Sequence, residues 1–216
     1  MRAGSGLWGR GVPPEFPRRD PHRRSPVEPS RPGPSQGDGL DPWLRERLFD
    51  RRLVMVHGVL TPDTASSVAA QLLALGAMGS SRVQMHLACP DGDLGAVFTL
   101  VDTLDLMRVT VCAVVTAELG GAALGVLAAA RQRTAYPHAR FRLIEPRVDD
   151  ISGTADEIVG QASRHLQMLE DLILRLAEVT GKPRSEIERD LSEGRMLSAA
   201  QAVEYGLIQE VVGPAS

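Results

Sequence analysis

Short apolar runs alternate along the chain with longer segments in which apolar residues recur every three or four positions. The short runs are typical of buried strands, and the longer spacing is typical of helices that pack on one side. The pattern predicts strands at 53–56, 83–89, 109–115, around 134, 140–145 and 207–212. It predicts helices at 62–75 and 94–104, a third ending near 131, and three more at 154–180, 183–191 and 198–206.

Capping residues mark several of these helix starts. Thr61 precedes Pro62, and capping boxes begin at Thr154 and at Ser198, each with Glu or Gln three residues later. Strands that alternate with helices through short turns indicate a parallel α/β sheet with right-handed crossovers. The segment from 154 to 180 would make a helix roughly 37 Å long, about the diameter of a small domain. We therefore expect it to project from the domain as a handle and to meet a partner.

The segment 116–123, with the sequence TAELGGAA, stands between one apolar run and the next. A strand, a small polar and glycine-containing turn and an alanine-rich helix form the elbow at which many hydrolases carry a nucleophilic serine. Here the bend carries Leu119.

Residues 1–39 differ from the rest of the chain in composition. They hold eight of the fifteen prolines, seven glycines and seven arginines, with very few aliphatic residues. Such a segment cannot bury enough apolar surface to offset the entropy lost on ordering. The sequence predicts a disordered tail at 1–39 and one folded domain at 40–216.

Composition narrows the function classes. A net charge of −3 argues against a nucleic-acid groove or a basic membrane surface, and we expect neither partner. Cys89 and Cys112 lack companions at metal-binding spacing and are interpreted as core residues in a reducing compartment. No apolar stretch reaches the length of a membrane span, and no secretory signal is present. We expect a cytoplasmic protein with no metal and no cofactor.

The region from 40 to 212 resembles the ClpP proteolytic subunit of Clp proteases, which shares a spiral of βαβ units with the crotonases. The resemblance rests on CPDG at 89–92, where the family has Ser-Pro-Gly-Gly, and on Glu145-Pro146, where it has Gln-Pro. Its most specific part is the string MLSAAQAVEYGLI at 196–208. The resemblance implies a ClpP/crotonase-like α/β fold with a projecting handle helix.

The resemblance also locates the three residues of the family's Ser-His-Asp triad. The serine falls on Leu119, the histidine on Ile144 and the aspartate on Gly194. Leucine cannot attack a carbonyl carbon, isoleucine cannot carry a proton, and glycine cannot orient an imidazole. Because triad members act as a unit, we expect no useful hydrolysis from this site.

Two features of the site are expected to persist. The family's oxyanion donors are backbone N–H groups, and they match Gly92 and Gly120. Glu118 and Glu145 would flank the empty nucleophile position. This leaves open a crotonase-like acyl-thioester enzyme, in which the N–H pair holds an enolate and a glutamate moves the proton. A second alternative is an active Clp serine endopeptidase with a relocated nucleophile.

The preferred hypothesis is a catalytically degenerate ClpP-like subunit. It would join catalytic paralogues in stacked rings through its long helix and have a structural or regulatory role in ATP-dependent protein degradation. His86, Leu106 and Thr134 stand where the family's outer clefts carry aromatic residues. An ATPase unfoldase of the AAA+ class would therefore dock through the partner subunits.

Overall fold

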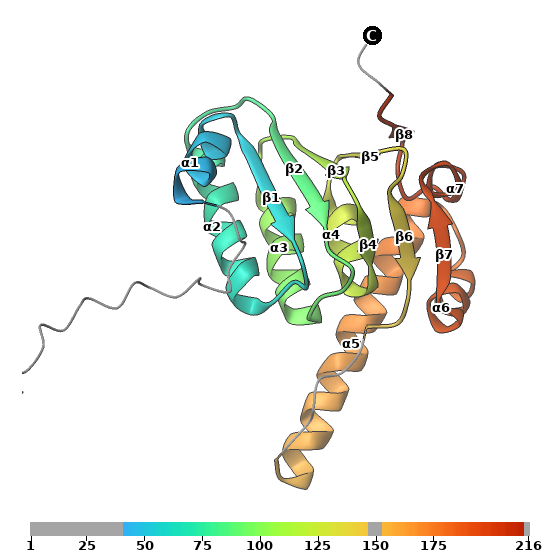
Figure 1. Cartoon of the computed structure of the whole chain (residues 1–216). Coiled ribbons are helices and arrows are strands. Elements are labelled where there is room, and N and C mark those ends of the chain that lie inside the picture. Colours follow the sequence, from blue (N-terminus) through green and yellow to red (C-terminus); the bar gives the residue numbers. More distant parts are fainter. Residues whose placement is uncertain (1–40, 147–152, 214–216) are drawn as a thin grey trace, which may run out of the picture. The chain divides into compact units, whose positions relative to one another are not determined.

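The computed structural model describes residues 41–146 and 153–213, which lie in one compact unit (Figure 1). Residues 1–40, 147–152 and 214–216 lie outside the described residues. The predicted disordered tail and its boundary at residue 40 therefore stay predictions.

The described elements follow one another in the alternating order that the sequence predicts. The helices are α1 (Pro42–Asp50), α2 (Pro62–Ala77), α3 (Leu94–Leu106), the 3-10 turn η1 (Gly121–Ala123), α4 (Leu124–Ala129), α5 (Ala155–Thr180), α6 (Arg184–Glu193) and α7 (Ala199–Tyr205). The strands are β1 (Leu53–His57), β2 (Val83–Ala88), β3 (Val111–Val115), β4 (Glu118–Gly120), β5 (Gln132–Ala135), β6 (Arg140–Leu143), β7 (Arg195–Ser198) and β8 (Glu210–Val211).

The larger sheet has five parallel strands in the order β1-β2-β3-β5-β8. Helices α2, α3 and α4 lie behind it in Figure 1 and cover one face. Residues of these helices and of the inward side of the strands form one hydrophobic core, which includes Leu72, Met85, Leu100 and Leu127. The opposite face of the sheet carries no helix in Figure 1. The predicted parallel α/β fold is confirmed.

A smaller sheet of three strands has the order β4-β6-β7. Strand β4 is parallel to β6, and β7 is antiparallel to it. The sequence pattern missed β4 and β7, and it also missed α1. The predicted strand-to-helix elbow is corrected accordingly: β3 is followed by the short strand β4, the turn η1 and then α4.

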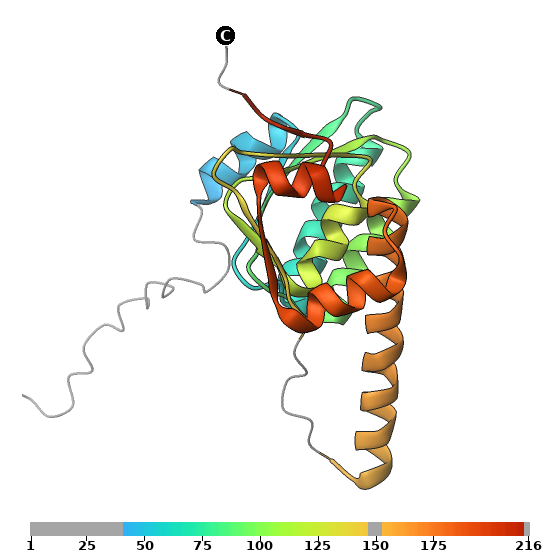
Figure 2. The ribbon, with the colours of Figure 1, turned by 90° about the vertical axis from the view of Figure 1, so that its right-hand side faces the viewer.

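Helix α5 extends beyond both sheets in Figures 1 and 2. Its capping box is present: the Thr154 hydroxyl accepts from the N–H of Glu157, whose carboxylate accepts from the N–H of Thr154. Its buried residues, Leu172, Ile173 and Leu176, lie in its last third. The first half of the helix instead exposes apolar side chains, including Val159 and Leu166, each 64% exposed. The predicted projecting handle is confirmed, and its free half presents apolar surface.

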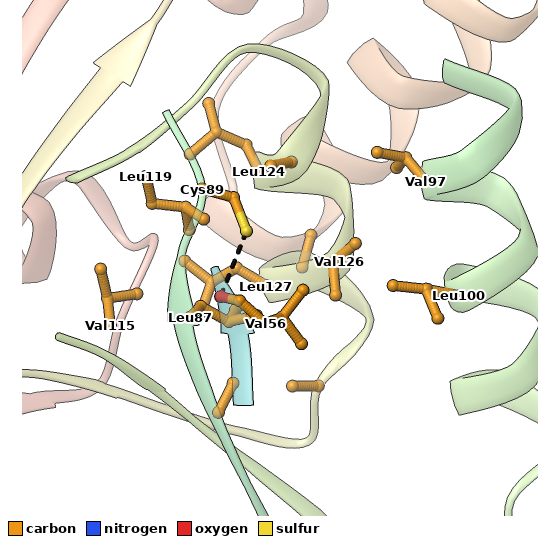
Figure 3. Close-up of a cluster of buried hydrophobic side chains, with 14 of the residues drawn as sticks. Val56, Leu87, Cys89, Val97, Leu100, Val115, Leu119, Leu124, Val126 and Leu127 are labelled. Atoms are coloured by element: carbon orange, nitrogen blue, oxygen red, sulfur yellow. Dashed lines mark hydrogen bonds between the residues drawn. The ribbon is translucent and has the colours of Figure 1, made fainter. Parts of the chain in front are cut away.

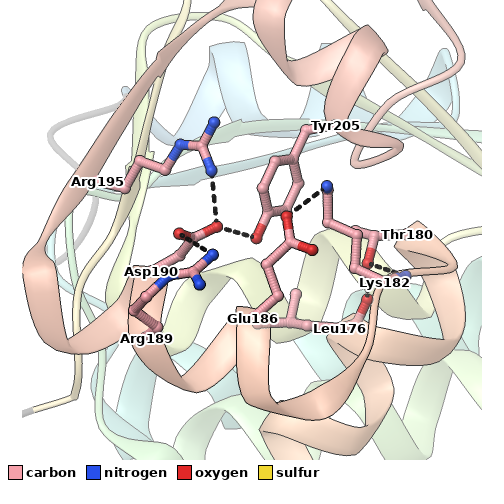
Figure 4. A network of polar contacts seen from close by, with 8 residues as sticks. All are labelled: Leu176, Thr180, Lys182, Glu186, Arg189, Asp190, Arg195 and Tyr205. Carbon is pink, nitrogen blue, oxygen red and sulfur yellow. Dashed lines mark hydrogen bonds and ion pairs between the residues drawn. The ribbon is translucent and has the colours of Figure 1, made fainter.

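A buried acid joins the elements that follow α5 (Figure 4). The Asp190 carboxylate on α6 accepts hydrogen bonds from the Tyr205 hydroxyl, at 2.7 Å, and from the Arg195 guanidinium, at 2.9 Å. Lys182 and Arg195 both lie over the Tyr205 ring, at 4.6 and 5.2 Å from its centroid. Burial, together with the neighbouring carboxylate, raises the pKa of Tyr205 above its ordinary value, so the hydroxyl stays a donor. This network ties α6, β7 and α7 to one another.

Of the two cysteines, only one is a core residue. Cys89 is buried and its thiol donates to the carbonyl of Val56 at 3.3 Å. Cys112 is half-buried, and its thiol donates to the side-chain oxygen of Gln132. The interpretation of Cys112 as a core residue is wrong, because its position in β3 faces the side of the sheet without helices.

The Asp190 network gives a stability prediction. Tyr205→Phe removes a hydrogen bond to a buried carboxylate and is expected to lower the free energy of unfolding by about 2 kcal/mol. The measurement is equilibrium urea unfolding. The matched control is Tyr136→Phe, since the Tyr136 ring is 41% exposed, and we expect a change under about 0.5 kcal/mol. Equal effects of the two substitutions would contradict the prediction.

Candidate functional site

The three positions that the sequence analysis singled out lie on neighbouring strands of the smaller sheet. Leu119 on β4 is paired with Phe141 on the central strand β6. Ile144 directly follows β6, and Gly194 directly precedes β7. Leu143 pairs with Arg195, so one further step of this antiparallel register sets Ile144 opposite Gly194. Ile144 and Gly194 thus face each other at one end of the sheet, whereas Leu119 is level with Phe141, three residues before Ile144.

Leu119 is part of the hydrophobic core. Its side chain is 0% exposed and belongs to the same cluster as Leu87, Cys89 and Leu124. Figure 3 shows it among these side chains at the end of the strands. A nucleophile must meet its substrate, whereas this side chain is enclosed by apolar neighbours. The position serves packing.

Ile144 and Gly194 provide backbone structure at the other two positions. Gly194 has φ of 71° and ends helix α6 in the left-handed conformation, with its N–H donating to the carbonyl of Leu191 at 3.3 Å. The N–H of Glu145, next to Ile144, donates to the same carbonyl at 3.1 Å. These two bonds hold the loop after β6 against the end of α6. Neither position offers a group that moves a proton.

A cavity of about 320 Å³ lies beside this loop, between the base of α5 and α6. It is bordered by Glu145, Leu169, Ile173, Glu188, Arg189, Leu191 and Ser192. The Ser192 hydroxyl donates to the carbonyl of Arg189 at 2.9 Å. The cavity therefore has an apolar side from α5 and a charged side from α6.

The two predicted oxyanion donors are both hydrogen-bonded within the chain. The N–H of Gly120 donates to the carbonyl of Cys89 at 2.9 Å, and the N–H of Gly92 donates to Oδ1 of Asp91 at 2.8 Å. The same Asp91 oxygen lies against Gly121, where an added Cβ would overlap it. An oxyanion of a bound substrate would have to displace a carbonyl and a carboxylate. In this structure the two N–H groups do not form an open oxyanion hole.

The two glutamates near the site differ in their contacts. Glu118 is half-exposed, and its Oε1 lies 3.6 Å from Nε of Arg142, whose guanidinium also donates to the carbonyl of Pro90 at 3.2 Å. Glu145 is exposed at the mouth of the cavity described above. Glu118 thus forms an ion pair on the surface of the smaller sheet.

The histidines of the folded region lie on other elements. His86 is on β2 of the larger sheet, on the face without helices. Its ring and the Tyr136 ring are packed edge to face, with their centroids 6.3 Å apart. Burial and the nearby His57 lower the pKa of His86. His138 is exposed in the turn before β6, and His165 lies on the handle. Ser198 caps α7 as predicted, since its hydroxyl accepts from the N–H of Gln201 at 3.3 Å.

The described residues were also compared with the requirements of a metal site and of a membrane-spanning helix. Within 41–146 and 153–213, no group of three or more His, Cys, Asp or Glu side chains is placed to hold a metal ion. None of the helices in those ranges combines the length and the apolar character needed to cross a bilayer.

Sequence reasoning missed two features near the site. The first is the hydrogen bond that the N–H of Gly92 donates to the Asp91 carboxylate. Its one visible signal in the sequence was the acid at position 91, where the family that the chain resembles has glycine. The second is the buried Asp190, which the helical pattern of α6 does not distinguish from a surface acid. The first contact joins adjacent residues through a side-chain rotamer, and the second depends on Arg195 and Tyr205, which lie on later elements.

Comparison with known proteins matches the folded part of the chain to one family. Residues 41–215 match the family model described as Clp protease. The chain is 31% identical over 184 residues to the ATP-dependent Clp protease proteolytic subunit 1 of Mycobacterium tuberculosis, covering 82% of this chain and 90% of the relative. It is 33% identical over 169 residues to the protein of the same name from Bifidobacterium longum, covering 77% and 72%. The Thermobifida fusca protein of that name is 27% identical over 169 residues, covering 77% and 76%.

The burial of Leu119 gives a prediction that separates a core residue from a substituted nucleophile. Leu119→Ser removes buried carbon and places a hydroxyl in the core, so we expect a loss of about 4 kcal/mol in the free energy of unfolding. The control is Leu106→Ser, because the Leu106 side chain is 80% exposed, with an expected change under about 0.5 kcal/mol. Urea unfolding of both variants measures the difference. If Leu119→Ser were tolerated as well as Leu106→Ser, the packing role would be refuted.

Proposed function

The chain belongs to the Clp protease family, and from this premise we propose that it is a catalytically degenerate ClpP-like subunit that assembles with catalytic paralogues. Its role would be structural or regulatory within an ATP-dependent Clp peptidase. The observation that carries the proposal is the core position of Leu119, where the family resemblance implies the nucleophile. The residues at the other two triad positions support backbone structure in place of proton transfer.

The backbone of the site supports the same proposal. A working oxyanion hole needs free donors aimed at the position where charge develops. Here the N–H groups of Gly92 and Gly120 donate to Asp91 and Cys89. Those contacts disfavour the crotonase-like alternative, since an enolate would need the same two donors. The serines near the site are also engaged, Ser192 with a backbone carbonyl and Ser198 in its helix cap.

The handle supplies a surface for assembly. Its N-terminal half projects past the sheets and exposes Ile158, Val159 and Leu166. Apolar side chains on a projecting helix are stabilised when a partner covers them. The curated relatives named above are proteolytic subunits of an ATP-dependent Clp protease, and a partner subunit with an intact triad is the partner that the family suggests.

The central test uses the full chain co-expressed with a related chain from the same genome that carries Ser, His and Asp at the three positions. We expect the two to co-purify, and native mass spectrometry to show both in one complex. Replacing the partner's nucleophilic serine by alanine should abolish peptide hydrolysis by that complex, because this chain has no nucleophile to contribute. The chain alone should show no labelling by a fluorophosphonate probe.

Peptidase activity that survives in the complex with the partner's serine replaced would contradict the proposal and favour a relocated nucleophile. Turnover of an acyl-thioester by the purified chain would favour the crotonase-like alternative. If the genome encoded no related chain with an intact triad, the proposed mixed assembly would be contradicted.

A second prediction concerns the handle. Val159→Ser with Leu166→Ser removes exposed apolar surface from α5, and we expect the amount of mixed complex recovered to fall at least about tenfold. Arg164→Ser with Gln167→Ser is the matched control, because both residues are exposed on the same part of the helix. Native mass spectrometry of each co-purified sample gives the comparison. Equal recovery of complex with both pairs would show that assembly does not depend on the apolar handle surface.

A further inference from the structure

Two histidines lie on neighbouring strands of the larger sheet, on the face that carries no helix in Figure 1. His57 is the last residue of β1, and His86 lies within β2. The parallel register pairs Met55 with His86 and His57 with Ala88. Because side chains alternate between the two faces of a strand, His57 and His86 point to the same face. The two imidazoles are therefore diagonal neighbours across one strand pair, although they are far apart in the sequence.

His86 is held in place and has an unused nitrogen. Its ring is packed edge to face against the Tyr136 ring, on the far side of β3 from β2. Its Nε2 atom is buried and forms no hydrogen bond with any residue that the structure describes. Leaving a buried polar atom without a partner costs free energy, so a ligand that bonds to this nitrogen stabilises the fold. A ring nitrogen of a neutral imidazole that does not donate a hydrogen bond is a metal ligand.

The surroundings of the pair favour a cation held between the two rings. Ala88 is the residue opposite His57, so no long side chain of β2 stands beside that imidazole. The two rings are within electrostatic range, because His57, together with burial, lowers the pKa of His86. The arginines of this face precede β1 and β2 and thus lie at the opposite strand ends, where screening limits their repulsion of a bound ion.

We propose that His57 and His86 form a binding site for a divalent transition-metal ion, represented by Zn²⁺. Imidazole nitrogens are suitable ligands for Zn²⁺, Cu²⁺ and Ni²⁺, whereas Mg²⁺ and Ca²⁺ require oxygen ligands. Within 41–146 and 153–213 no third His, Cys, Asp or Glu completes a metal-binding group, so water molecules fill the remaining coordination positions. The ion joins the edge strand β1 to β2 and gives the buried nitrogen of His86 a partner.

This site is independent of the proposed assembly and of the triad positions. The spacing of the cysteines, on which the expectation of no metal rests, carries no information about the pair. Only the pairing of β1 with β2 brings the two histidines together.

The test is isothermal titration calorimetry of the full chain with ZnCl₂, after a chelator has removed bound metal and has itself been dialysed away. Titration with MgCl₂ measures non-specific binding of a divalent cation. We expect a site that takes one Zn²⁺ ion per chain, and no comparable binding of Mg²⁺. Because an ion that binds the folded state alone stabilises it, Zn²⁺ is also expected to raise the Tm of the chain.

Variants locate the site. His57→Asn and His86→Asn are each expected to weaken Zn²⁺ binding at least about tenfold and to remove the rise in Tm, since one imidazole is left to hold the ion. His138→Asn is the matched control, because that residue is exposed in the turn before β6. Cys112→Ser is a second control on the same face, where the thiol already donates to Gln132. Both controls should keep the wild-type affinity.

Three results would overturn the proposal: no binding of Zn²⁺ by the wild type, equal binding of Mg²⁺, and loss of affinity in either control as large as in His57→Asn. Circular dichroism confirms that each variant is folded, and if His86→Asn does not fold, the substitution of His57 at the sheet edge decides alone. Metal binding is measured on the isolated chain, whereas the proposed function is decided by co-purification and by hydrolysis in the mixed complex. Failure of one is thus distinguishable from failure of the other.

Discussion

The close approach of β4 to the turn at 90–92 is the contact on which the site depends. The N–H of Gly120 donates to the carbonyl of Cys89, and a Cβ at Gly120 would lie 2.7 Å from the carbonyl oxygen of Pro90. Only a residue without a side chain allows this distance. The contact joins the smaller sheet to the end of β2 and directs the Leu119 side chain into the core. The backbone geometry at Gly120 thus sets the packing of the neighbouring position as well as its own.

That constraint explains how residues without the chemistry of a triad at these three positions are compatible with the fold. Catalysis by a triad requires a nucleophile, a base and an orienting acid in hydrogen-bond contact. Folding requires that the same three strand ends meet without voids and without unpaired backbone groups. A leucine in the core, an isoleucine after β6 and a glycine that caps α6 meet the second requirement. The N–H of Gly92 is likewise paired within the chain, because it donates to the Asp91 carboxylate.

The sequence predicted those parts of the fold that have local causes. Apolar runs gave β1, β2 and β3, and the caps at Thr61, Thr154 and Ser198 marked the starts of α2, α5 and α7 because a hydroxyl and an N–H within three residues suffice. Strands β4 and β7 were missed because three or four residues of mixed polarity carry no readable period. The family resemblance located Leu119, Ile144 and Gly194. It could not predict that the N–H of Gly120 donates to the carbonyl of Cys89, since that bond arises from tertiary approach. Nor could it predict that the side chain of the adjacent Asp91 accepts from the N–H of Gly92.

Two surfaces of this chain differ in the kind of association they favour. The free half of α5 exposes apolar side chains, and burial of apolar area gives contacts that are long-lived and little affected by salt. The cavity of about 570 Å³ on the outer face of the larger sheet is bordered by arginines and amides as well as by the Tyr136 ring, and contacts of its charged groups gain more from electrostatic steering than from buried area. The handle and this cavity lie on separate elements, α5 and the outer face of the larger sheet. A partner that covers one of these surfaces therefore does not have to contact the other.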